Sequence, residues 1–169
     1  MAKKVFYSFY YDEDVWRVQQ IRNIGSVEGQ PLLKANEWEE IRRKGTQSIQ
    51  NWINDQMNYK DCVIVLIGEH TADREWVQYE VKLAKAKGKP MLGIYIHNIK
   101  DSAGKTSNKG KNPFDVVFGY GKHNYACYEP RDSTRFYNGI KAYDDIGNNI
   151  ESWYNSAVQA NKINRMFGF

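Results

Sequence analysis

The sequence has little of what a metal site or a disulfide framework requires. It contains 2 cysteines and 3 histidines in 169 residues, without the clustering that zinc ligands show. Cys62 and Cys127 fall in short apolar stretches, where cysteines are usually buried. We therefore interpret both as strand residues and expect neither a metal site nor a cofactor.

Long hydrophobic runs are also missing. No segment approaches the roughly 20 apolar residues that span a bilayer. The first apolar segment reaches Asp12 after a few residues and is too short for a signal peptide. We therefore expect a cytoplasmic protein that has no membrane partner.

Neither charge dominates. The 24 basic and 20 acidic side chains leave a net charge of +4 (24 − 20). No dense basic stripe with interleaved aromatic residues is present, so we expect no nucleic-acid partner. The mild excess remains compatible with an anionic ligand.

The rest of the composition is that of a globular protein. Hydrophobic residues make up 41% and aromatic residues 14%, enough for a core in a chain of this length. We expect one domain over residues 1–169. Its last element is a long helix with an apolar face, formed by Ile146, Ile150, Trp153, Ala157 and Ala160.

Three short apolar runs, at residues 5–10, 63–67 and 91–96, predict buried strands. Two weaker strands are expected at 32–35 and 125–128. Helical patterns fall between the runs. One would be capped by Asp12 or Asp14, one would begin at Thr46 or Ser48, and one would run from 73 to 87 before Gly88.

Alternating strands and helices predict parallel pairing through right-handed crossovers. The expected class is therefore α/β, with a flavodoxin-like, doubly wound and mainly parallel sheet flanked by helices on both faces. Ligands of such folds bind beyond the carboxyl ends of the strands. That rule directs attention to residues 8–14, to 68–80 and to the segment after Ile96.

Glu80 is the unusual residue of the helix expected at 73–87. The apolar stripe includes Trp76 and Ala84, and Glu80 lies four residues from each, so it belongs to the same face. A buried glutamate needs a partner or lines a pocket. It either pairs with Arg74 or Lys87, which is the commoner arrangement in proteins, or belongs to a functional site.

Other candidates also have two interpretations. Tyr10 and Asp12 follow the first strand, and they either begin a helix or face a ligand. Trp38 and Trp76 are either core anchors or rings that stack on a ligand base.

Five segments together resemble bacterial TIR-like domains of Thoeris antiphage systems, the ThsB-like proteins. They are residues 3–12 (KKVFYSFYYD), 38–39 (WE), 62–68 (CVIVLIG), 74–80 (REWVQYE) and 112–115 (NPFD). The resemblance runs from Lys3 to Asp115. It implies a TIR fold over a single domain and NAD as substrate rather than as cofactor.

The resemblance also implies an activity and its residues. Family members cleave the nicotinamide–ribose bond, and Thoeris members form a cyclic ADP-ribose-like signal that activates a separate effector protein. Their essential glutamate lies on the helix after the third strand, which is Glu80 here. The substrate-binding candidates in matching motifs are Ser8, Phe9, Tyr10, Asp12, Trp38, Trp76 and Asn112. Such an enzyme is of the NAD glycohydrolase or ADP-ribosyl cyclase type.

Three other functions remain open. A non-catalytic TIR module would oligomerise, with the apolar tail of Met166, Phe167 and Phe169 as its interface. A nucleoside deoxyribosyltransferase-like enzyme would also use a glutamate at a glycosidic bond. A receiver domain would use Asp12 and Asp14, but the strand ending at Ile67 leads to Gly68-Glu69 and not to an acceptor aspartate.

Overall fold

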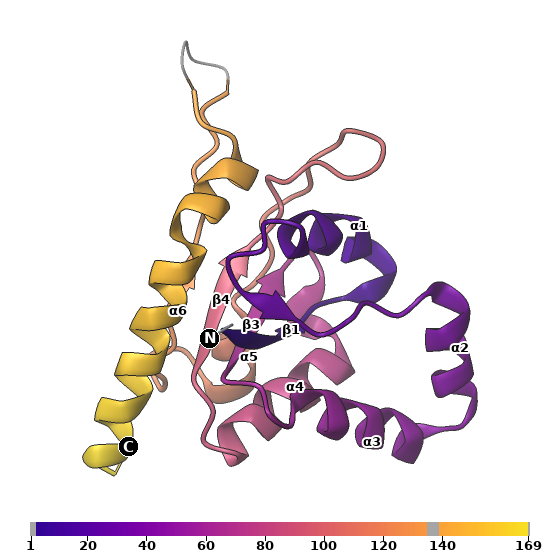
Figure 1. The fold of residues 1–169 in the computed structure, drawn as a ribbon, viewed down its shortest axis with the longest axis vertical. Helices are drawn as coiled ribbons and strands as arrows, with labels where there is room; N and C mark the ends of the chain where they lie inside the picture. The colour runs from indigo at the N-terminus through magenta and orange to yellow at the C-terminus, as the bar shows by residue number, and fades with distance from the viewer. Residues whose placement is uncertain (1–2, 135–138, 169) are drawn as a thin grey trace.

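The computed structural model describes residues 3–134 and 139–168, and its core is a five-stranded parallel sheet of order β2-β1-β3-β4-β5 (Figure 1). The strands are β1 (Lys4–Ser8), β2 (Glu28–Gly29), β3 (Cys62–Ile67), β4 (Met91–Tyr95) and β5 (Cys127–Tyr128). This order is that of flavodoxin-like sheets. The predicted fold class is confirmed, and the three core strands lie within a few residues of their predicted positions.

Helices cover both faces of the sheet. They are α1 (Tyr11–Arg22), α2 (Ala35–Arg43), α3 (Thr46–Met57), α4 (Glu75–Ala86), α5 (Pro113–Phe118) and α6 (Ala142–Met166), with a 3-10 turn, η1 (Thr71–Asp73). Successive strand side chains point to opposite faces. In β3, Ile64 and Leu66 face the α1 and α6 layer, whereas Val63, Val65 and Ile67 face α2 to α5. Figure 1 shows α6 and the α3–α4 pair on opposite sides of the sheet.

The strand predicted at residues 32–35 is wrong. The edge strand is the two-residue β2, and residue 35 begins α2. Trp38 is the buried residue of α2, so that helix shows no apolar stripe in the sequence. The Gln30 side chain extends the pairing of the short strand β2 with β1. It accepts a hydrogen bond from Tyr7 N and donates one to Tyr7 O, both at 2.8 Å. A side-chain amide thus supplies ladder bonds that no apolar pattern encodes.

The start of α1 also differs from the prediction. Tyr10 is its N-cap and no side chain caps the helix. Asp12 and Asp14 lie in the first turn, where negatively charged side chains interact favourably with the positive end of the helix dipole. Asp14 is buried and accepts a hydrogen bond from Arg17 Nη1 at 3.0 Å. Its contact is thus a structural ion pair within α1. Arg17 Nε in turn donates to Ile99 O at 2.7 Å, which ties the loop after β4 to α1.

The two later helices follow the predicted patterns. α4 ends at Ala86, and Gly88 has a φ of +67°, as expected for a glycine that terminates a helix. Ile146 and Ile150 of α6 are buried against the sheet. Met166 and Phe167 remain 79% and 69% exposed, so they do not pack on the domain; Phe169 lies outside the described residues.

Cys62 is buried in β3 and Cys127 is half-buried in β5, as predicted. Among the helices of the described residues, none is both long and apolar enough to cross a membrane.

Candidate active site

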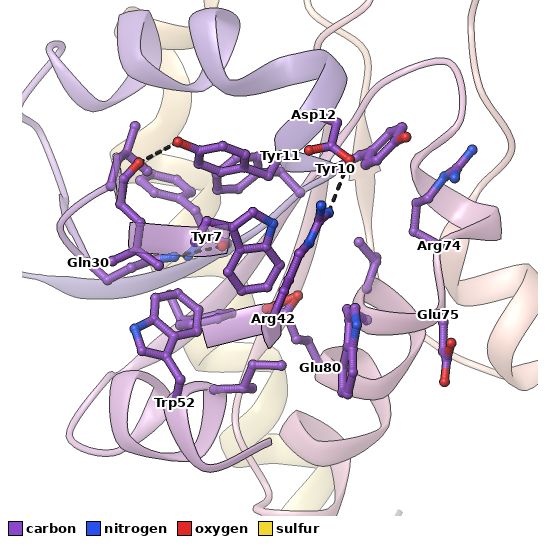
Figure 2. Close-up of a pocket in the computed structure, with 18 of the residues that line it drawn as sticks. Tyr7, Tyr10, Tyr11, Asp12, Gln30, Arg42, Trp52, Arg74, Glu75 and Glu80 are labelled. Carbon is purple, nitrogen blue, oxygen red and sulfur yellow. Dashed lines mark hydrogen bonds and ion pairs between the residues drawn. The ribbon is translucent and has the colours of Figure 1, made fainter. Parts of the chain in front are cut away.

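A pocket of about 270 Å³ opens at the carboxyl end of β1, between strands that lead to opposite faces of the sheet (Figure 2). This is the switch point at which doubly wound folds bind ligands. Its walls come from the segment after β1, the segment after β2, and helices α2, α3 and α4. The lining residues are Phe6, Tyr7, Phe9, Tyr10, Tyr11, Asp12, Gln30, Pro31, Leu32, Leu33, Trp38, Arg42, Trp52, Ile53, Arg74, Glu75, Trp76, Val77 and Glu80.

Glu80 is the buried carboxylate of this pocket. Its side chain comes from the second turn of α4, and the residue is 7% exposed. Val77 and Val81 of the same helix pack into the core, so the apolar stripe that holds α4 on the sheet also carries the glutamate inward. The sequence pattern therefore located both the helix face and its exception.

The ion-pair interpretation of Glu80 is wrong. Arg74 lies over the Tyr10 ring at 4.1 Å, and Lys87 Nζ donates to Asn58 Oδ1 at 3.2 Å. Within residues 3–134 and 139–168, Glu80 has one hydrogen-bond donor, the Ser8 hydroxyl, at 3.4 Å. Burial raises the pKa of the Glu80 carboxyl well above its ordinary value, and the Ser8 hydrogen bond acts in the opposite direction.

Aromatic rings form one wall of the pocket. Phe9, Tyr11, Trp38 and Trp52 follow one another with ring centroids 6.1, 6.2 and 6.0 Å apart. Tyr11 Oη donates to Leu33 O at 2.5 Å, which fixes that ring. The Trp38 indole N–H is buried and has no hydrogen-bond partner among the described residues. This wall offers flat apolar faces to a planar ligand.

Two arginines stand at the rim. Arg42 Nη2 lies 3.1 Å from Asp12 Oδ2, and Arg42 Nη1 lies 3.2 Å from Glu39 Oε1. The Arg42 guanidinium is also 5.1 Å from the Trp38 ring centre. Figure 2 shows Arg42 reaching toward Asp12 and Arg74 standing beside Tyr10.

Most predicted site residues meet at this pocket. Those that line it are Glu80, Phe9, Tyr10, Asp12, Trp38 and Trp76. Ser8 is fully buried at the end of β1 and reaches the pocket through its hydrogen bond to Glu80. These placements agree with a shared site, whereas their roles in binding or catalysis remain predictions.

Asn112 does not join them. It is the N-cap of α5, and its side chain accepts from Phe114 N at 2.9 Å and from Asp115 N at 3.4 Å. Asn followed by Pro is a helix-start signal, so a local structural role accounts for this motif.

The sequence did not identify Gln30, Arg42, Trp52 and Arg74 as site residues, although all four line the pocket. Arg42 lies four residues after Trp38, a spacing that becomes informative once α2 is known to be a helix. Trp52 lies at helical spacing from Ile49 in α3, and the sequence gives no sign that this stripe ends at a pocket.

The fold and the site define a parallel α/β domain with a buried carboxylate in a pocket at the switch point of the sheet. The family model "Thoeris protein ThsB, TIR-like domain" matches residues 6–101. The chain therefore belongs to the TIR-like domain family of the Thoeris protein ThsB.

A curated relative supports the same assignment. A protein of Bacillus cereus (strain MSX-D12) named "Putative cyclic ADP-D-ribose synthase ThsB1" is 35% identical over 122 residues, which are 69% of this chain and 64% of that protein. The chain thus matches less than two thirds of the length of that relative.

Proposed function

We propose that this chain is an NAD-consuming enzyme that cleaves the nicotinamide–ribose bond and forms a cyclic ADP-ribose-like signal. The observation that carries the proposal is the Glu80 carboxylate, which is buried in the pocket and has no cation paired with it among the described residues. Membership of the ThsB family and the name of the Bacillus cereus relative support the substrate and the cyclic product. The signal would diffuse to a separate effector protein, in the cytoplasm.

The chemistry requires a fixed anion more than it requires an acid. The bond between the ribose C1 and the pyridinium nitrogen breaks, and its electron pair stays on that nitrogen, so nicotinamide leaves neutral and without protonation. Positive charge develops on the ribose as an oxocarbenium ion, as in glycoside cleavage. A carboxylate held beside this carbon stabilises the charge with little reorganisation. Glu80 is our candidate for that anion.

The raised pKa of Glu80 is consistent with a site in which the ligand supplies the positive charge that the carboxylate needs. Without a ligand, burial favours the protonated carboxyl. A pyridinium ring beside it favours the anion, because an opposite charge within a few ångströms lowers a carboxyl pKa. Binding of the cationic substrate is therefore coupled to ionisation of Glu80.

The neighbouring groups have supporting roles in this proposal. Ser8 donates to Glu80 and orients the carboxylate. Trp38 and Trp76 line the pocket and present faces on which nicotinamide or adenine can stack. Phe9, Tyr10 and Asp12 form the side of the pocket after β1.

The second step decides the product. A ring nitrogen or hydroxyl of the substrate's own ADP-ribose attacks C1 and closes the ring, whereas attack by water gives linear ADP-ribose. A hydroxyl or water loses its proton in this step, and a ring nitrogen takes on the positive charge until its ring releases a proton. The apolar wall of aromatic rings reduces access of water to C1 and so favours the internal nucleophile.

The test is Glu80→Gln, which keeps the shape and removes the charge. Purified protein at high concentration is incubated with NAD, and nicotinamide and the nucleotide products are identified by liquid chromatography and mass spectrometry. We expect the variant to lose most of its NAD consumption. Glu40→Gln removes the same charge from an exposed position on α2 and should behave like the wild type.

Undiminished NAD consumption by Glu80→Gln would show that Glu80 is not the catalytic anion. The exposed Met166 and Phe167 favour a second candidate, a TIR module that acts through self-association. That candidate predicts concentration-dependent oligomers without nicotinamide release. Exchange of nucleobases on a deoxynucleoside would instead indicate a nucleoside deoxyribosyltransferase.

A further inference from the structure

The charges of the pocket are arranged in two levels. Glu80 lies inside and is almost fully buried, whereas Arg42 and Arg74 stand at the mouth. Both arginines contact the same segment after β1, Arg74 over the Tyr10 ring and Arg42 at Asp12. The two guanidinium groups therefore lie at the mouth together with the carboxylates of Asp12 and Glu75, and Glu80 is the one buried carboxylate among the described residues that line the pocket.

Arg74 is available to an anion. Within the described residues it forms no ion pair, and its polar contact is a hydrogen bond from Nε to His70 O at 3.4 Å. It is also the N-cap residue of α4, and no side chain caps that helix. The unpaired N–H groups at the start of a helix favour negative charge, so Arg74 and the helix terminus act in the same direction.

Arg42 can be released to an anion at low cost. Its ion pairs to Asp12 and Glu39 are half-exposed, with side-chain exposures of 37% for Arg42, 47% for Asp12 and 60% for Glu39. Exposed pairs of this kind exchange readily with other partners. A phosphate offers a guanidinium two parallel hydrogen bonds and a higher charge than a carboxylate.

The size of the pocket limits how much ligand it encloses. Its volume of about 270 Å³ lies just below the roughly 300–1,000 Å³ typical of pockets that enclose a drug-sized ligand. A dinucleotide is larger than that, so one of its halves stays at the rim or outside. The cationic pyridinium end suits the interior, where Glu80 lies, and the anionic end suits the arginines.

We infer that Arg74 and Arg42 form a diphosphate subsite, which orients a pyridine dinucleotide with its nicotinamide–ribose end toward Glu80 and its adenylate half at the rim. This inference rests on the proposed function and deepens it, since it names the part of the substrate that each end of the pocket recognises. In this arrangement Asp12 holds Arg42 in the absence of the ligand.

The test is binding of ADP-ribose, which carries the diphosphate but lacks the reacting bond, measured by isothermal titration calorimetry at fixed salt. We expect Arg74→Gln to weaken the affinity by about 10- to 100-fold, the range for losing a hydrogen bond to a charged group. Arg42→Gln/Arg74→Gln should bind more weakly still. Arg74→Lys, which keeps the charge without the planar fork, should be intermediate.

Two further variants control for net charge. Arg43→Gln removes the same charge from an exposed neighbour that does not line the pocket, and it should bind within about twofold of the wild type, as expected for a surface substitution. Asp12→Asn frees Arg42 and should strengthen binding by about two- to fivefold, the range for an exposed ion pair.

The inference is overturned if the wild type does not bind ADP-ribose, or if Arg74→Gln binds it as the wild type does. The proposed function fails separately. Suppose that Glu80→Gln consumed NAD at the wild-type rate while Arg74→Gln bound ADP-ribose more weakly than the wild type. The diphosphate subsite would then be supported, and the assignment of Glu80 as the catalytic anion would be wrong. If Glu80→Gln were inactive while Arg74→Gln kept its affinity, the reverse would hold.

Discussion

Glu80→Gln should make the protein more stable at neutral pH, although it abolishes the proposed activity. In the wild type the carboxyl is 7% exposed, receives one long hydrogen bond of 3.4 Å and has no cation beside it in the described residues. At neutral pH the folded state therefore holds this carboxyl either as a buried charge or with a proton that the unfolded chain does not bind, and both cost free energy that a neutral side chain avoids. Glutamine keeps the hydrogen bond from Ser8 and carries no charge.

The expected gain follows from these contacts. Desolvation of an incompletely satisfied polar group costs about 1–3 kcal/mol, and more when it is charged, so we expect a gain of about 2 kcal/mol at neutral pH. For a chain of 169 residues, each kcal/mol shifts Tm by about 2–4 °C. The variant should therefore melt about 4–8 °C above the wild type.

The pH dependence gives the sharper test. Because the folded pKa of Glu80 is raised above its ordinary value of 4.5, the wild type has its full stability below that pH and loses stability as pH rises through the folded pKa. The difference in Tm between the variant and the wild type should be close to zero near pH 4 and should grow toward pH 8. Circular dichroism melts across that range measure it.

Glu40→Gln is the control, because Glu40 is 66% exposed in its ion pair with Lys44; its Tm should follow that of the wild type within the small range of surface substitutions. A Glu80→Gln protein that is no more stable than the wild type at pH 8, or whose gain grows toward acid pH, would refute the reasoning.

Two further predictions concern the groups around the pocket. Ser8→Ala removes the hydroxyl that lowers the pKa of Glu80; the pKa should rise further, and the acid limb of kcat/KM for NAD should move to higher pH, while an unchanged limb would show that this hydrogen bond does not set the ionisation. Gln30→Leu leaves the buried N–H and C=O of Tyr7 without their partners, and the free energy of unfolding in urea should fall by about 2–4 kcal/mol from two such losses. Exposed Gln19→Leu is its control, and an equal loss in both variants would contradict the role of Gln30.

The parts of the fold that bury apolar side chains could be predicted from the sequence. β3 and β4 are continuous apolar runs, and the apolar residues of α3, α4 and α6 recur at helical spacing. These patterns predict which side chains of the five elements are buried. Glu80 could be located for the same reason, as the exception on such a stripe. Predictions failed where polar contacts decide the structure.

β2 and α2 show that limit. Two residues of strand and one buried side chain in a nine-residue helix give no periodic signal, and the ladder bonds from Gln30 depend on a partner 23 residues away. Arg42 reaches the pocket from α2, and Trp52 reaches it from α3. Arg42 and Trp52 line the same pocket because α2 and α3 are placed next to each other by the tertiary fold, and the local sequence pattern carries no information on that placement.

The position of Glu80 on a packing stripe has a consequence for how the pocket distinguishes its ligands. Val77 and Val81 pack α4 against the sheet, so Glu80 stays at the inner end of the pocket, and in the proposed reaction a cation bound there balances its charge. A pyridinium brings that balancing charge, whereas neutral nicotinamide does not. In the proposed reaction nicotinamide leaves neutral, and the positive charge beside Glu80 is lost once C1 has been captured and the attacking group has released its proton. The carboxyl then returns to its protonated form, and the attraction that drew the substrate inward is lost. In the proposed reaction, the same burial that weakens the fold would thus favour entry of the cationic pyridinium end of the substrate and departure of neutral nicotinamide.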